Sequence, residues 1–94
     1  MLERILTRFR DRVRARRYVM TLHAEEEMDD DGLSIFDVES AILTGKIVQR
    51  QIDGHSGERK YLVRGWSVDQ EKTIVVVVKL GPGGRLVILT VYTE

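Results

Sequence analysis

The sequence of 94 residues predicts an α+β domain in which N-terminal helices pack on a four-stranded antiparallel β-meander. Two observations lead to this prediction. Apolar residues recur at helical spacing up to about residue 45, whereas alternating and β-branched residues dominate from there onward. The segment 73–92, TIVVVVKLGPGGRLVILTVY, places Gly-Pro-Gly-Gly between two apolar runs, which is typical of a β-hairpin.

The charges divide this single domain, residues 1–94, into three parts, although the net charge is zero. Residues 1–17 carry seven Arg and two acids, residues 18–45 carry eight acids and no Lys or Arg, and residues 46–94 carry eight bases and five acids. The sequence has no cysteine, which excludes a disulfide framework, and no apolar run is long enough to span a bilayer. We therefore expect a cytoplasmic protein that does not use a membrane.

Residues 2–16 predict an amphipathic helix with an Arg-rich outer face. Its apolar stripe consists of Leu2, Ile5, Leu6, Phe9 and Val13. Arginines recur every four residues on the other side, at Arg4, Arg8, Arg12 and Arg16. This basic face is either a solvated surface or a binding surface for RNA, the ribosome or an acidic partner, for which Arg8 and Arg12 are the candidate residues.

Two further helices are expected in the acidic part, at residues 22–31 and 35–44. Each begins after a residue whose side chain can accept a hydrogen bond from a free amide, Thr21 for the first and Ser34 for the second. Asp37, three residues after Ser34, completes a capping box. A glycine follows each helix, and a short extended link precedes the first.

Four strands are expected after residue 45, at residues 47–52 and 58–66 and in the two arms of the hairpin. If Leu80 lies opposite Arg85, one face of the hairpin carries Ile74, Val76, Val78, Val87, Leu89 and Val91, and the other Val75, Val77, Leu86 and Ile88. Because both faces are largely apolar, neither is expected to be exposed to water. We therefore expect the hairpin in the middle of the sheet, with helices or a partner chain, such as the second copy of a homodimer, covering both faces.

The sequence contains the groups that cleavage of an RNA phosphodiester requires. One group must take the proton from the 2′-hydroxyl, another must protonate the leaving oxygen, and a cation must offset the phosphate charge. The candidates are His23, Arg59, Lys60, Thr90 and Tyr92. Alternation along a strand places Arg59 and Lys60 on opposite faces, so only one of them can face a given site. The alternatives are a structural role for His23 and a place at the edge of the core for Tyr92.

Short motifs are distributed over residues 18–92. They are Thr21-x-His23-Ala24-x-x-x-Met28, Gly32-Leu33-Ser34-x-x-Asp37-Val38-x-x-Ala41-Ile42-x-x-Gly45-x-Ile47, Gly57-x-Arg59-x-Tyr61-Leu62-Val63-x-Gly65 and Val87-Ile88-x-Thr90-Val91-Tyr92. Together they resemble the bacterial family catalogued as domain of unknown function 4258. That family is similar in fold to the small RelE-like toxins of toxin–antitoxin systems, which are mRNA endonucleases.

The resemblance implies helices packed on a curved antiparallel sheet, with His23, Arg59, Tyr61, Thr90 and Tyr92 around one cleft. It further implies a metal-independent, toxin-type endoribonuclease without a cofactor. In that enzyme His23 is the general base or acid, Arg59 stabilises the phosphate, and Tyr92 donates or orients a proton. The resemblance also implies an antitoxin partner.

A second hypothesis is a non-catalytic interaction module, either a homodimer or one half of a complex. Family members commonly carry basic residues where this chain has Glu27 and Asp31, so the helix with His23 is acidic, and an acidic helix repels phosphate. The contiguous aspartates of residues 29–31 lack the spacing of a calcium-binding loop, so no metal site is expected. Convergence of His23, Arg59 and Tyr92 in one open cleft would favour the enzyme.

Overall fold

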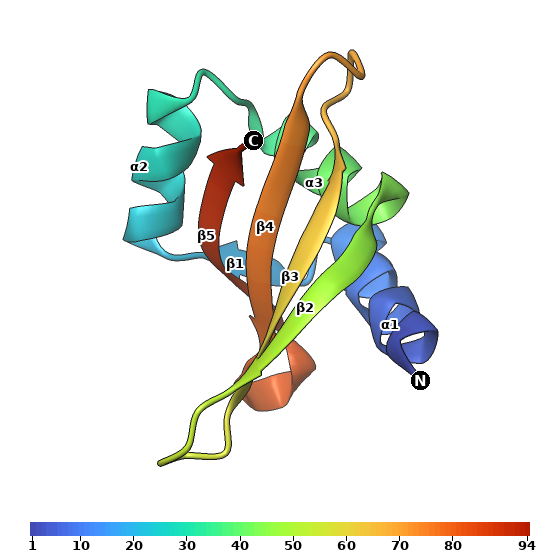
Figure 1. Cartoon of the computed structure of the whole chain (residues 1–94), viewed down its shortest axis with the longest axis vertical. Helices are drawn as coiled ribbons and strands as arrows, with labels where there is room; N and C mark the ends of the chain where they lie inside the picture. The colour runs from blue at the N-terminus through green and yellow to red at the C-terminus, as the bar shows by residue number, and fades with distance from the viewer.

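The computed structural model describes residues 1–94 as three helices and one five-stranded mixed sheet, which confirms the α+β class. The elements in chain order are α1 (Leu2–Arg14), β1 (Tyr18–Met20), α2 (Leu22–Asp30), α3 (Ile35–Thr44), β2 (Lys46–Ile52), β3 (Arg59–Trp66), β4 (Thr73–Leu80), the 3-10 turn η1 (Pro82–Gly84) and β5 (Leu86–Thr93). The strand order is β1-β5-β4-β3-β2. In Figure 1 helix α3 lies behind the strands, α1 extends to the right of β2, and α2 stands beside β5.

The link before α2 forms an additional strand, β1. The sheet therefore has five strands, whereas four antiparallel strands were expected. Strand β1 pairs in parallel with β5, with Tyr18 opposite Leu86 and Met20 opposite Ile88, whereas all other pairings are antiparallel. Three residues are too few to show strand alternation in the sequence, and their pairing with a strand some 68 positions away has no local signal. Strand β1 covers only the first half of the outer edge of β5.

The register of the central hairpin also differs from the predicted one. Leu80 pairs with Leu86 instead of Arg85, and a bulge leaves Leu89 without a partner on β4. Because the turn shifts the pairing by one residue, Val87 does not face the core as expected. The β5 residues that are fully buried are Leu86, Ile88 and Val91.

The predicted helix starts are confirmed by their caps. The Thr21 hydroxyl accepts a hydrogen bond from the amide of Ala24 at 3.1 Å. At α3 the Ser34 hydroxyl accepts from the Asp37 amide, and the Asp37 carboxylate accepts from the Ser34 amide at 3.0 Å. Helix α1 ends two residues earlier than expected, at Arg14.

The helices cover one face of the sheet only, so the expectation that helices might cover both is not met. The buried helical residues Leu6, Phe9, Val13, Val38, Ala41 and Ile42 form one core with Tyr61, Val63, Ile74, Val76, Val78, Leu86, Ile88 and Val91. Strand alternation puts the intervening strand residues on the opposite side. We call this side the open face; it carries Val19, Lys46, Gln49, Gln51, Lys60, Leu62, Arg64, Trp66, Thr73, Val75, Val77, Lys79, Val87, Thr90 and Tyr92.

Helix α3 packs directly on the backbone of β3 at Gly65. A Cβ atom placed on Gly65 would lie 2.0 Å from the carbonyl oxygen of Ala41, and one on Gly45 would lie 2.3 Å from the same oxygen. Only glycine permits this approach. The contact fixes β3 in an orientation in which Arg64 and Trp66, the two neighbours of Gly65, point to the open face.

Candidate functional site

Two carboxylates of α2 bind the part of the β5 edge that β1 leaves free. The Glu27 carboxylate accepts a hydrogen bond from the Val91 amide at 3.2 Å, and the Asp31 carboxylate accepts from the Thr93 amide at 3.1 Å. Both amides would otherwise lack a strand partner. The acidic character of this helix therefore has a structural reason, which sequence reasoning missed because it lies between residues distant in the chain.

Glu27 also holds His23 at this edge. The imidazole Nε2 lies 3.1 Å from the Glu27 oxygen that accepts from the Val91 amide at 3.2 Å, so this nitrogen is at most 6.3 Å from the β5 backbone. His23 remains 68% exposed, whereas Glu27 is 26% exposed. Ala24 and Met28 pack against the core, so His23 and Glu27 lie on the adjoining flank of α2, away from the core.

Thr90 and Tyr92 precede and follow Val91 on β5, and their side chains lie on the open face. Tyr92 of β5 pairs with Val75 of β4, and Val75 pairs with Arg64 of β3. These three residues form one row across the sheet, so the basic residue Arg64 lies two strands away from Tyr92. With strands about 4.8 Å apart, the Cα atoms of Tyr92 and Arg64 are roughly 10 Å from each other. Thr90 and Tyr92 thus flank Val91, the β5 residue to which His23 is linked through Glu27.

The open face is basic and carries two exposed aromatic rings. Its cations are Lys46, Lys60, Arg64 and Lys79, and its nearby acids are Glu58 and Glu94. Arg64 lies 3.7 Å from Glu94, with both side chains about half exposed, which makes a weak ion pair that an external anion can replace. Trp66 is 49% exposed and Tyr92 is 37% exposed. A hollow of about 340 Å³ beside Trp66 is lined by Arg64, Gly65, Trp66, Thr73 and Glu94.

Arg59 and Tyr61 lie on the other side of the sheet. Tyr61 is a core residue whose ring meets the edge of Phe9, with centroids 5.4 Å apart. Arg59 is five residues along β3 from the row of Tyr92 and two strands away, so their Cα atoms are roughly 19 Å apart. The five residues that the resemblance placed around one cleft are therefore divided between the two sides of the sheet, and the expected convergence of His23, Arg59 and Tyr92 is not found. Of the neighbouring pair Arg59 and Lys60, only Lys60 is on the side of Tyr92, as alternation requires.

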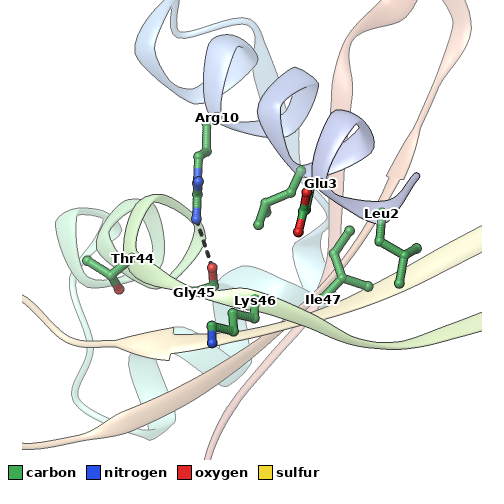
Figure 2. Close-up of a pocket in the computed structure, with 8 residues that line it drawn as sticks. Leu2, Glu3, Arg10, Thr44, Gly45, Lys46 and Ile47 are labelled. Carbon is green, nitrogen blue, oxygen red and sulfur yellow. Dashed lines mark hydrogen bonds between the residues drawn. The ribbon is translucent and has the colours of Figure 1, made fainter.

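The arginines of α1 divide into structural and free ones. Arg12 donates to the carbonyl of Gly84 at 2.5 Å and so fastens the β4–β5 turn to the helix. Arg10 donates to the carbonyl of Gly45 at 2.8 Å across a cavity of about 470 Å³ between α1 and the start of β2 (Figure 2). Arg8 makes no such bond and lines a separate pocket with Arg59 and Tyr61. Arg8 is therefore free for the predicted binding role, whereas the side chain of Arg12 is used in a hydrogen bond that stabilises the fold.

Sequence reasoning missed three residues of the open face and its border. Arg64 has the same parity along β3 as Lys60, and Trp66 follows in the same series, so alternation alone could have identified them. The role of Glu27 could not be found in this way. The second histidine, His55, lies on the exposed β2–β3 turn, where its amide donates to the Asp53 carboxylate at 2.8 Å.

These features define a small α+β domain with one face of its sheet covered by helices and the other open, basic and partly aromatic. A family model described as "Domain of unknown function (DUF4258)" matches residues 20–93. The chain therefore belongs to this family. A comparison with curated proteins and one with solved structures each gave no match. None of the three helices combines the length and the apolar character needed to cross a bilayer.

Proposed function

We propose that this protein is a toxin-type endoribonuclease of the RelE-like kind, which binds single-stranded RNA on the open face and cleaves it at the border formed by α2 and β5. The observation that supports this function best is the exposed His23, held by Glu27 beside a basic face with exposed aromatic rings. Aromatic side chains stack on the bases of single strands, and cations bind the phosphates.

The proposed reaction needs no group beyond those of the chain. When Nε2 of His23 donates to Glu27, the lone pair of Nδ1 is free to take the proton of a 2′-hydroxyl. The 2′-oxygen then forms a bond to phosphorus, the bond from phosphorus to the 5′-oxygen breaks, and Tyr92 protonates that leaving oxygen. The products are a 2′,3′-cyclic phosphate and a free 5′-hydroxyl.

Arg64 takes the role that the sequence suggested for Arg59. It lies on the same face as Tyr92 and in the same row, and its guanidinium can bind two phosphate oxygens at once. Lys60 and Lys79 add positive charge further along the strands. In this proposal Arg59 has no part in cleavage.

The same face also suits a protein partner, because its centre is apolar. Leu62 and Val77 lie between the row of Arg64 and the row of Lys79, Val87 lies opposite Lys79, and Val19 at the border is 40% exposed. An antitoxin segment that covers this face would block RNA binding. A second copy of the chain, binding without any catalysis, is the alternative function that this apolar centre favours.

Induced expression in a bacterial host, followed by cleavage assays on purified RNA, tests the proposal. We expect the wild type to arrest growth and cut RNA, and we expect His23→Ala, Tyr92→Phe and Arg64→Gln each to lower the cleavage rate by about 10²-fold or more. The matched controls are His55→Ala, an exposed histidine away from the border, and Arg59→Gln. Absence of arrest and of cleavage with a folded wild type would refute the enzyme, and a concentration-dependent dimer would then favour the binding module.

A further inference from the structure

A second basic site lies on the helix-covered side of the sheet, away from the open face. Three arginines from three segments, Arg8 of α1, Arg50 of β2 and Arg59 of β3, line one pocket of about 490 Å³. In the register Arg50 pairs with Tyr61, which puts Arg50, Arg59 and Tyr61 on the same side of the β2–β3 ribbon. The pocket is thus assembled by the fold from residues more than 40 positions apart.

The three guanidinium groups have no partner within the chain. The arginines that do form hydrogen bonds or ion pairs are Arg10, Arg12, Arg14, Arg17 and Arg64. The one carboxylate in the pocket, Glu58, lies 3.0 Å from Lys79 and is already paired. Like charges gathered in one pocket repel each other, so an anion bound there would stabilise the folded chain.

The walls of the pocket are apolar on one side. Ile5 and Leu80 line it together with Tyr61, whose ring is held in place by the edge-to-face contact with Phe9. Such a wall can accept a flat, weakly polar group next to the charged one. A lone inorganic anion would leave this wall exposed to water.

We propose that this pocket binds a nucleotide through its phosphates, with Arg8, Arg50 and Arg59 holding the phosphates and the apolar wall holding the base. Guanidinium groups bind phosphate oxygens in pairs, and three of them match the charge of a diphosphate. The nucleotide is either free in solution or the phosphorylated end of an RNA strand. The site is separate from the proposed cleavage border, and its occupation does not require that RNA be cleaved.

Isothermal titration of the full chain with ADP, pyrophosphate, adenosine, and a short RNA with or without a 5′-phosphate tests this site. We expect ADP or the 5′-phosphorylated RNA to bind, pyrophosphate to bind more weakly, and adenosine to give no heat. ADP at a free concentration a hundredfold above its Kd should raise the Tm of the protein by about 11–22 °C. Binding of ADP identifies a free nucleotide as the ligand. Since RNA without a 5′-phosphate can still bind to the open face, tighter binding of the phosphorylated RNA than of the unphosphorylated RNA, without binding of ADP, identifies a strand end.

Substitution of the arginines decides whether the pocket is the place of binding. Arg50→Gln and Arg59→Gln should each weaken binding at least about tenfold, because each removes charge-assisted hydrogen bonds. Arg85→Gln changes an exposed arginine outside the pocket and should have no effect, and His23→Ala should bind as the wild type does. The proposal is overturned if ADP does not bind at millimolar concentration in low salt and a 5′-phosphate does not strengthen the binding of RNA, or if Arg85→Gln weakens binding as much as Arg59→Gln.

Discussion

Replacing Gly65, the one glycine within a strand of the sheet, by Ala should strongly destabilise the fold. The new Cβ atom would lie 2.0 Å from the carbonyl oxygen of Ala41 and 2.8 Å from its carbonyl carbon, where ordinary contacts begin at 3.4 Å. Backbone lies on both sides of this contact, so α3 would have to retreat by about 1.4 Å from β3. Overpacking of this kind costs about 1–3 kcal/mol, and we expect the upper end because no flexible side chain can yield.

A loss of about 3 kcal/mol corresponds to a fall in Tm of roughly 12–24 °C for a domain of this size. Thermal and urea unfolding followed by circular dichroism would measure it. Gly54→Ala is the matched control, since Gly54 lies in the β2–β3 turn and has no atom within 4 Å of an added Cβ. If Gly65→Ala unfolded within 0.5 kcal/mol of the wild type, the tight approach of α3 to β3 would be refuted.

Three other substitutions test the charges and polar contacts that hold the helices. Burial, together with the hydrogen bond to Glu39, raises the pKa of Tyr18 from 10.0 to about 12. The free energy of unfolding should therefore fall as pH rises from 10 to 12. In Tyr18→Phe, the free energy of unfolding measured by urea titration at each pH should not show this fall. Hydrogen bonds from backbone amides lower the pKa of Asp37, so the ionised side chain stabilises the folded state above pH 3.8, and this stabilisation is lost as pH falls below that value. Asp37→Ala should lower the free energy of unfolding, measured with urea at pH 7, by about 1 kcal/mol. Arg10→Met should lower the free energy of unfolding by about 1.5–3 kcal/mol, because it removes both hydrogen bonds from Arg10 to carbonyls at the end of α3. As a control, substitution of the exposed Arg14 by Met should change the free energy of unfolding by less than 0.5 kcal/mol in the same assay.

Local signals in the sequence were sufficient to predict the helices. Thr21 and Ser34 with Asp37 cap the helices as expected, because capping depends on residues three positions apart. The opposite directions of Arg59 and Lys60 were also predictable, since alternation is a property of any strand. These predictions needed no knowledge of the chain beyond a few neighbours.

Contacts between distant segments were not predictable in the same way. The pairing of β1 with β5, and the bulge at Leu89 that sets the faces of Thr90 and Tyr92, depend on residues far apart in the chain. The candidate site suffered most, because grouping Arg59 with Tyr92 requires the register of three strands. Alternation alone would have offered Arg64 in its place, but nothing in the sequence links Glu27 to the Val91 amide.

The carboxylates of α2 have a consequence for how molecules of this protein meet one another. A strand edge with unpaired amides can recruit the edge of another chain, which is a route to ordered aggregates. At β5 the amides of Val91 and Thr93 are already occupied by Glu27 and Asp31, so a further strand can pair only with β2 or with the outer edge of the three-residue strand β1. Replacement of both carboxylates by alanine would therefore expose the second half of the β5 edge, and the first sign would be association of folded chains into oligomers.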